Sequence, residues 1–267
     1  MVDVRRCRYH LNNVGERLAL SGRLQLCGRF VLEIEGRRLE HLLPGRQGRM
    51  LLEYLAVNRG RRLDRDEIAE ALWPQVVPPT APSALRVLIS KLRAVLGEGA
   101  LVGRSELTLL LPPGVRVDAE DALEAVHRAE SAVALEEWAR AWGPALLASF
   151  VAERRFLPAC EAPWIDQWRR QLTDVLEHAL ECYAASCLHL GGTELPAAER
   201  AAQRLIEHAP FRESGYRLLM EALEARGNVA EALLVYERLR TILRDELGTT
   251  PCPAVQEVHR RLLAAWT

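Results

Sequence analysis

Lysine is nearly absent from this 267-residue sequence, because Lys91 is the only one and arginine supplies the remaining positive charge. Since Lys91 is followed by leucine, the chain has no GxxxxGK[ST] loop for nucleotide phosphates. The motifs GxGxxG, HExxH and GxSxG are absent as well, which excludes the common signatures of dinucleotide-binding, zinc-hydrolase and serine-hydrolase sites. We therefore expect a protein that is not an enzyme and that needs no cofactor.

Long hydrophobic runs are also missing. No window approaches the roughly 18 uninterrupted apolar residues of a membrane span, and the N-terminus has no apolar segment of the secretory type. The six cysteines are scattered and show no CxxC spacing, which is typical of reduced thiols in the cytoplasm. We expect a cytoplasmic protein without membrane contact.

Potential metal ligands gather at only one place in the sequence. His178, Cys182 and His189 share one face of a predicted helix. Their spacing matches no familiar zinc motif, and a fourth ligand is missing. We interpret them as incidental residues of a helical surface and predict no metal site.

The charges are divided unevenly along the chain. Residues 1–117 contain 19 Lys+Arg and 12 Asp+Glu, whereas residues 118–267 contain 16 and 24. A basic half joined to an acidic half suggests that only the first half meets a polyanion such as nucleic acid. A chance split between two domains is the alternative.

The first half has the pattern of a winged helix-turn-helix. Residues 1–21 lack periodicity and are predicted to be a flexible segment, and residues 24–43 read as short strands with a hairpin turn at Gly36. Three helical patterns follow. Asp64 and Glu67 form a capping box at the start of the second. Arg104 and Ser105 lie at the tip of a closing hairpin. We predict an α+β domain of the OmpR type over residues 22–117.

The third helical pattern, residues 82–97, has two distinct faces. Leucine and isoleucine recur at the spacing of a buried stripe: Leu85, Leu88, Ile89, Leu92 and Leu96. Gly97 then ends the helix. In a winged helix-turn-helix the third helix enters the major groove, so the opposite face is the predicted contact surface. An ordinary solvated surface is the alternative for this face.

The predicted DNA contacts follow from the chemistry of the exposed side chains. Arginine bonds guanine, serine bonds several bases, and valine methyls meet the thymine methyl. We predict that Arg86, Ser90 and Arg93 read bases and that Lys91, at the edge of the face, meets phosphate. The full recognition-helix set is Ser83, Arg86, Val87, Ser90, Lys91 and Arg93. The predicted backbone and wing contacts, which position without specifying, are Arg46, Arg49, Arg61, Arg62 and Arg104.

Strand signals stop at Asp118, and helical patterns separated by short breaks follow. Short breaks favour antiparallel helical hairpins. Similar stretches begin at Ala198 and Ala230, close to the 34-residue tetratricopeptide period. We predict an all-α, tetratricopeptide-like domain over residues 118–267. Four tryptophans in these patterns are expected in its core: Trp138, Trp142, Trp164 and Trp168.

Two stretches carry a family resemblance. GRRLDRDEIAEALWP followed by ALRVLISKLRAVLG resembles the DNA-binding half of the Streptomyces antibiotic regulatory protein family of actinobacterial transcriptional activators. ARGNVAEALLVYERLRTILRDELGTTPCPAVQEVHRRLL resembles the bacterial transcriptional activation domain of that family. The resemblance covers about residues 22–265, and no receiver, forkhead-associated or ATPase segment is recognisable, which indicates the small stand-alone form.

The resemblance implies a specific mode of action. The family implies dimerisation on direct DNA repeats and contact with RNA polymerase, through the sigma factor and other subunits. Arg86, Ser90, Lys91 and Arg93 match its recognition-helix surface. Two features depart from it: the wing SELTLLLPPG lacks a glycine-tyrosine tip, and Ser83 stands where a cation is common.

We therefore expect a nucleoid-associated, sequence-specific transcriptional activator that binds promoter direct repeats as a homodimer and recruits RNA polymerase. Two alternatives remain open. The chain is a protein-interaction adaptor whose winged helix serves docking, or it is a regulator gated by a small molecule in the helical half. Retention of DNA binding by isolated residues 1–117 favours the first hypothesis over the adaptor.

Overall fold

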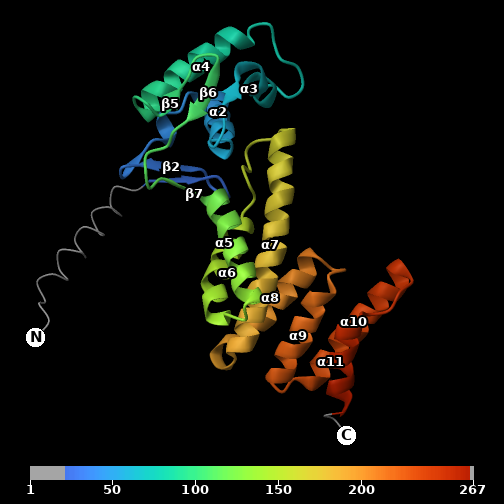
Figure 1. Ribbon diagram of the computed structural model, residues 1–267. Coiled ribbons are helices and arrows are strands. Elements are labelled where there is room, and N and C mark those ends of the chain that lie inside the picture. Colours follow the sequence, from blue (N-terminus) through green and yellow to red (C-terminus); the bar gives the residue numbers. More distant parts are fainter. Residues whose placement is uncertain (1–21, 265–267) are drawn as a thin grey trace, which may run out of the picture. The chain divides into compact units, whose positions relative to one another are not determined.

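The computed structural model describes residues 22–264 and divides into two compact units (Figure 1). The first unit comprises the chain up to Asp121 together with residues 154–171, and the second comprises residues 122–153 and those from Leu172 onward. The predicted flexible segment 1–21 lies outside the described residues. Each unit is built around its own buried apolar side chains.

The first unit begins with a four-stranded sheet. Its strands are β1 (Arg23–Gln25), β2 (Val31–Ile34), β3 (Arg37–Arg38) and β7 (Arg116–Val117), in the order β3-β2-β1-β7. Neighbours are antiparallel except β1 and β7, which run parallel. Glu35 and Gly36, both with positive φ (51° and 74°), join β2 to β3. This two-residue turn matches the twist of the strands and confirms the hairpin predicted at Gly36.

Three helices and a second, smaller sheet complete the winged helix. The helices are α2 (Gly45–Val57), α3 (Arg65–Leu72) and α4 (Ala81–Leu96), and a short 3-10 turn, η1 (Glu40–Leu42), precedes them. The second sheet is antiparallel, in the order β4 (Leu63–Asp64), β6 (Glu106–Leu109) and β5 (Leu101–Val102). Strands β5 and β6 form the wing. This arrangement confirms the predicted α+β winged helix-turn-helix.

Local sequence signals fix the helix ends as expected. The Asp64 carboxylate accepts a hydrogen bond from the Glu67 backbone N–H at 2.7 Å and caps α3. Gly97, with φ of 90°, ends α4. The five apolar residues predicted as the stripe of α4 are all buried, and α4 packs against both α2 and α3.

A segment from far along the chain, residues 154–171, returns to the first unit; we refer to it as the returning segment. The Leu157 N–H donates to the Leu26 carbonyl at 3.0 Å, and the Gly28 N–H donates to the Arg155 carbonyl at 2.8 Å. Phe156 is 1% exposed. These contacts pair the returning segment with the backbone that follows β1, so the first unit is discontinuous in sequence.

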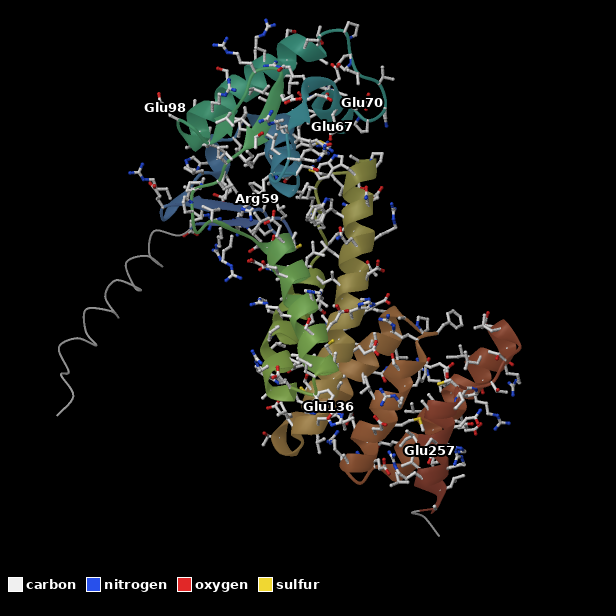
Figure 2. The ribbon with its side chains drawn as sticks, in the orientation of Figure 1. Arg59, Glu67, Glu70, Glu98, Glu136 and Glu257 are labelled. Carbon is white, nitrogen blue, oxygen red and sulfur yellow. The ribbon has the colours of Figure 1, made fainter. Side chains whose placement is uncertain are left out.

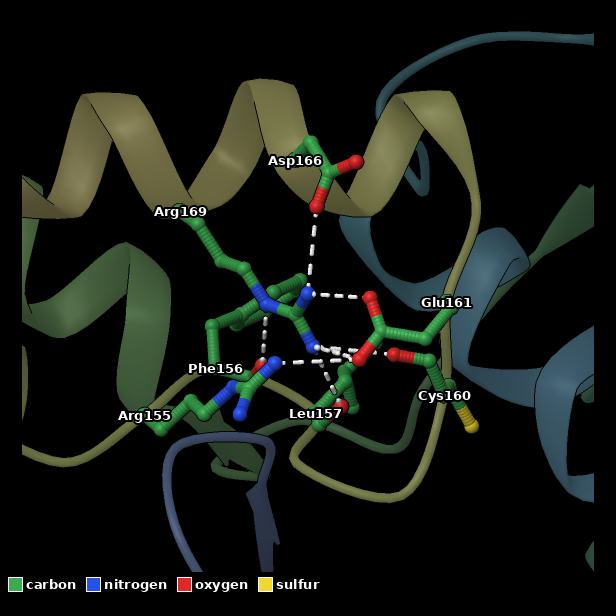
Figure 3. Close-up of polar contacts among 7 residues, drawn as sticks. All are labelled: Arg155, Phe156, Leu157, Cys160, Glu161, Asp166 and Arg169. Carbon is green, nitrogen blue, oxygen red and sulfur yellow. Dashed lines mark hydrogen bonds and ion pairs between the residues drawn. The ribbon is translucent and has the colours of Figure 1, made fainter.

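Arg169 holds the loop of the returning segment together (Figure 3). Its guanidinium donates to the backbone carbonyls of Phe156, Leu157 and Cys160 at 2.9–3.1 Å. It also forms ion pairs with Glu161 at 2.7 Å and Asp166 at 3.1 Å. A planar group with five donors suits several carbonyls of one irregular loop.

Trp164 anchors the returning segment to the helices of the winged helix. Its indole N–H donates to the Ala71 carbonyl at 3.3 Å, and its ring meets that of Tyr54 edge-on, with centroids 5.1 Å apart. The four tryptophans expected in the helical core are all half-buried. Two of them, Trp164 and Trp168, belong to the first unit.

The rest of the chain is helical, as predicted. The elements are α5 (Asp118–Ala134), α6 (Trp138–Ala152), α7 (Pro163–Leu190), η2 (Gly192–Glu194), α8 (Leu195–His208), α9 (Glu213–Ala225), α10 (Val229–Leu247) and α11 (Pro253–Ala264). In the second unit α8 packs on α9, and α9 packs on both α10 and α11. The fully buried residues Leu205, Tyr216, Leu239 and Val255 belong to the core that joins them.

The continuous helical pattern of residues 118–142 forms two helices, because α5 and α6 are separated at residues 135–137. Glu136 has φ of 58°, a left-handed conformation that ends a helix. No helix within residues 22–264 is both long and apolar enough to cross a membrane.

We predict that Phe156→Ala destabilises the first unit by about 3–5 kcal/mol, because it removes a fully buried ring. Amide hydrogen exchange over residues 23–34 in the full chain should accelerate by the corresponding factor. Phe150→Ala is the matched control, since Phe150 is 62% exposed and its loss should cost less than about 0.5 kcal/mol. Unchanged exchange in Phe156→Ala would show that the returning segment does not support the sheet.

Candidate nucleic-acid interface

Helix α4 presents a continuous exposed face opposite its buried stripe. Five of the six predicted recognition residues are exposed there: Ser83, Arg86, Val87, Ser90 and Lys91; we call these five residues the outer face. Their spacing of three, four, seven and eight residues places them on one side of the helix. Val87 is 53% exposed, so the face offers methyl groups between two cations.

Helix α4 contains no acidic residue. The next carboxylate along the chain is that of Glu98, which lies beyond the C-terminal end of the helix (Figure 2). Within the described part of the chain, Arg86 and Lys91 have no carboxylate at ion-pair distance. Their charges are therefore not neutralised by a carboxylate of residues 22–264. An outer face with two free cations and no carboxylate has the electrostatics that a phosphate backbone requires.

Ser83 has part of its hydrogen-bonding capacity in use. Its hydroxyl donates to the Thr80 carbonyl at 2.8 Å, in the first turn of α4. This bond helps to close the N-terminus of the helix. Donation from Ser83 to a phosphate or base would require this bond to break.

Arg93, the sixth predicted recognition residue, is half-buried and differs from the others. Its guanidinium donates from Nε to the Leu101 carbonyl at 3.0 Å and from Nη2 to the Gly103 carbonyl at 2.5 Å. These bonds tie the first wing strand and the turn after it to α4. These bonds use two of the five N–H donors of the guanidinium, so the predicted base contact of Arg93 would have to come from the remaining three.

The turn of the wing depends on glycine. Gly103 has φ of 98°, and a Cβ at this position would lie 1.8 Å from the Glu106 carbonyl oxygen. The side chain of Arg104 is exposed at the tip, while its carbonyl accepts from Arg65 Nε at 2.7 Å. The tip is thus fastened to α3 and presents a cation.

Of the five arginines predicted to contact the DNA backbone, two are bound by other groups of the first unit. Arg49 pairs with the fully buried Glu53 at 2.7 Å and lies over the Phe30 ring. Arg61 pairs with Glu67, whose carboxylate also accepts from the Tyr54 hydroxyl. Both are therefore occupied by contacts within the unit.

The other three are available. Arg46 and Arg104 are exposed, and among the described residues neither side chain has a carboxylate partner. Arg62 is 80% exposed in its side chain, with Glu106 at 3.8 Å, which is a loose surface pair of small energy. Together with Arg86 and Lys91, they are the cations that a polyanion can reach.

The buried carboxylate of Glu53 explains why Arg49 is held. Burial raises the pKa of Glu53, and the hydrogen bond from Arg49 opposes that shift. Removing Arg49 from this contact would leave a buried carboxyl without its cation, which is unfavourable. Arg49 therefore contributes to the packing of α2.

Sequence reasoning missed Gln47. It is exposed on α2 and borders a shallow hollow of about 390 Å³ together with Thr80, Ser83 and Val87 of the α4 region. Gln47 belongs to a different helix from the outer face, so no periodicity in the sequence connects them. Only the packing of α2 on α4 brings them together.

Two family models match the chain. "Transcriptional regulatory protein, C terminal" matches residues 42–104, and "Bacterial transcriptional activator domain" matches residues 115–263. The second covers more than half of the chain.

Similar proteins include the regulatory protein AfsR of Streptomyces griseus, 32% identical over 82% of this chain and 22% of the relative. The transcriptional regulator RedD of Streptomyces coelicolor is 27% identical over 81% of this chain and 63% of the relative. The chain thus spans about a fifth of AfsR and less than two thirds of RedD. These matches are to regulatory proteins, which confirms the prediction that the chain is not an enzyme.

A solved structure supports the architecture. Mycobacterium tuberculosis EmbR, in complex with a low-affinity phosphopeptide, has a TM-score of 0.78 at 21% identity, covering 92% of this chain and 65% of that chain. This likeness shows the same fold, a winged helix followed by a helical domain.

We predict that Arg93→Ala lowers the free energy of unfolding of the first unit by about 1–3 kcal/mol, because two carbonyls lose a charged donor. Arg86→Ala should change it by less than about 0.5 kcal/mol, since Arg86 makes no such bonds with residues 22–264. Urea unfolding of the two variants and hydrogen exchange over residues 101–109 measure the difference. Equal effects of the two substitutions would contradict the structural role of Arg93.

Proposed function

We propose that this chain, which belongs to the Streptomyces antibiotic regulatory protein family, is a sequence-specific DNA-binding activator of transcription. The observation that carries the proposal is the outer face of α4. It is exposed, free of carboxylates and backed by a stripe that is wholly buried. A helix anchored in this way can enter the major groove without rearranging its core.

The division of labour among the side chains follows from their surroundings. Arg86 and Ser90 lie near the middle of the outer face and are the proposed base readers. Lys91, Arg46, Arg62 and Arg104 are the proposed phosphate contacts. Arg93 is proposed to position the wing as well as to approach the groove.

The second part of the proposal concerns the helical half. Residues 22–117 are the proposed DNA-binding domain, and residues 118–267 are the proposed activation domain. The second range matches a bacterial transcriptional activator domain over most of its length. We propose that this domain recruits RNA polymerase through the sigma factor and other subunits. The protein would act as a homodimer on direct repeats, in the cytoplasm at the nucleoid.

DNA binding is tested by selection from a random duplex library with the purified full chain. Enriched sequences should contain a direct repeat, and affinity for them should fall steeply as salt rises, because neutralised phosphates release counterions. No enrichment over unselected DNA, or binding insensitive to salt, would reject the proposal.

We predict that Arg86→Ala weakens binding to the selected site by about 1–3 kcal/mol and relaxes specificity at one base pair. Lys91→Ala should weaken binding to selected and random DNA alike and reduce the magnitude of the salt slope by about one. Fluorescence anisotropy with both DNAs separates these outcomes. Equal losses on both DNAs for Arg86→Ala would assign Arg86 to phosphate.

Recruitment is tested by transcription in vitro from a promoter that carries the selected repeat. We predict more transcript with the full chain than with the Arg86→Ala variant at a protein concentration near the dissociation constant, because that variant occupies the site less. The adaptor alternative predicts binding to a protein partner without any effect on transcript from this template. Transcript levels that do not respond to the full chain would remove recruitment from the proposal.

A further inference from the structure

The helical unit contains a cleft that DNA binding does not use. It has a volume of about 440 Å³, within the range of small-molecule sites of roughly 300–1,000 Å³. Its walls come from α5, α6, α7 and α9, with Arg212 just before α9. All of these residues lie in the second unit.

One wall of the cleft is aromatic and preformed. The rings of Trp138 and His189 stack with centroids 3.8 Å apart and planes 4° from parallel. Because each ring fixes the other, the wall needs little ordering when a flat ligand arrives. Val133 and the buried Leu218 add apolar surface beside it.

The cysteine in the cleft is neutral. Burial, together with the nearby carboxylates of Glu130 and Glu181, raises the pKa of Cys182 to about 12. Within residues 22–264, no three His, Cys, Asp or Glu side chains are placed to hold a metal ion. The Cys182 thiol therefore lines the cleft as a small apolar group.

Some polar groups of the cleft have partners within the unit, whereas one buried donor has none among the described residues. His178 Nδ1 lies 2.6 Å from Glu130 Oε1, and Arg217 pairs with Glu221 at 2.9 Å. Arg212 Nη1 is buried and finds no hydrogen-bond acceptor among the described residues. Buried donors of this kind are uncommon because the missing bond is costly.

The carboxylates near Arg212 do not complete its bonding. Glu177 and Glu181 lie 3.5 and 3.6 Å from Nη1, which stabilises the charge but falls outside good hydrogen-bond geometry. The Arg212 side chain as a whole is 29% exposed and lines the cleft, so an oxygen anion that enters the cleft can accept a charge-assisted bond from its guanidinium.

We propose that this cleft binds a small aromatic monocarboxylate. The ring lies against Trp138 and Leu218, and the carboxylate accepts from Arg212. Glu130 and Glu181 face the same cleft and repel a second negative charge, which selects against phosphate esters and dicarboxylates. The inference goes beyond the proposed DNA binding and does not depend on it.

The test uses 1-naphthaleneacetate as the probe and its neutral amide, 1-naphthaleneacetamide, as the matched control ligand. Calorimetry with the full chain should give a dissociation constant on the order of 1 mM or tighter for the acid. The amide should bind at least about tenfold more weakly, because it lacks the charged acceptor. Equal affinity for the two ligands, or no binding of the acid at about 10 mM, would overturn the proposal.

Nuclear magnetic resonance locates the site. The Trp138 indole signal, identified by its loss in Trp138→Phe, should shift on addition of the acid, while the indole signal of Trp164 in the first unit should not. Shifts at Trp164 and none at Trp138 would place binding elsewhere and overturn the assignment.

Protein variants supply the final control. Arg212→Gln should weaken binding of the acid about tenfold or more. Arg240→Gln removes an arginine that is 52% exposed and pairs with Glu237 on the same helix, away from the cleft residues, and should leave affinity unchanged. Trp138→Leu, which removes the aromatic wall, serves if Arg212→Gln is poorly folded. Unchanged affinity in folded Arg212→Gln or in Trp138→Leu would overturn the proposal.

Discussion

Burial of the apolar stripe of α4 is the interaction on which the candidate interface depends. Leu85, Ile89 and Leu92 are almost wholly withdrawn from solvent, and their contact with α2 and α3 fixes how the helix is rotated about its axis. Because side chains on a helix keep fixed angular positions, this rotation turns Arg86 and Ser90 outward. The proposed DNA-binding surface is thus oriented by the buried apolar residues on the opposite side of the helix.

The arginines of the first unit fall into two groups, which differ in their surroundings: some bind groups within the unit, and others are exposed. Arg49 and Arg93 are held by a buried carboxylate and by wing carbonyls, and Arg169 binds the carbonyls of the returning segment. These contacts use the fixed fork of donors that lysine lacks. Arg46, Arg86 and Arg104 remain available to a phosphate backbone. A chain with a single lysine thus folds so that several of its arginine side chains bind carboxylates and carbonyls of the same unit.

The winged helix is not a unit of contiguous sequence. Phe156 and Trp164 come from the acidic half, yet both contact the basic half. Phe156 pairs with Cys27 just after β1, and Trp164 contacts α2 and α3. A boundary drawn between residues 117 and 118 follows the change from strand to helix patterns, whereas the buried contacts extend the first unit to residues 154–171. The charge split between residues 117 and 118 therefore does not coincide with the boundary between the two packed units.

Local sequence patterns determined the strands, the capping of α3, the stripe of α4 and the helical second half, because each depends on residues a few positions apart. The outer face of α4 followed from the same periodicity. Only the tertiary structure decided which arginines lack a carboxylate partner among residues 22–264, placed Gln47 beside Ser83, and returned residues 154–171 to the first sheet. It also left Arg212 Nη1, in the cleft, without a hydrogen-bond acceptor among those residues. These features join residues far apart in the chain, and the packing of one element on another, which no local period encodes, brings them together.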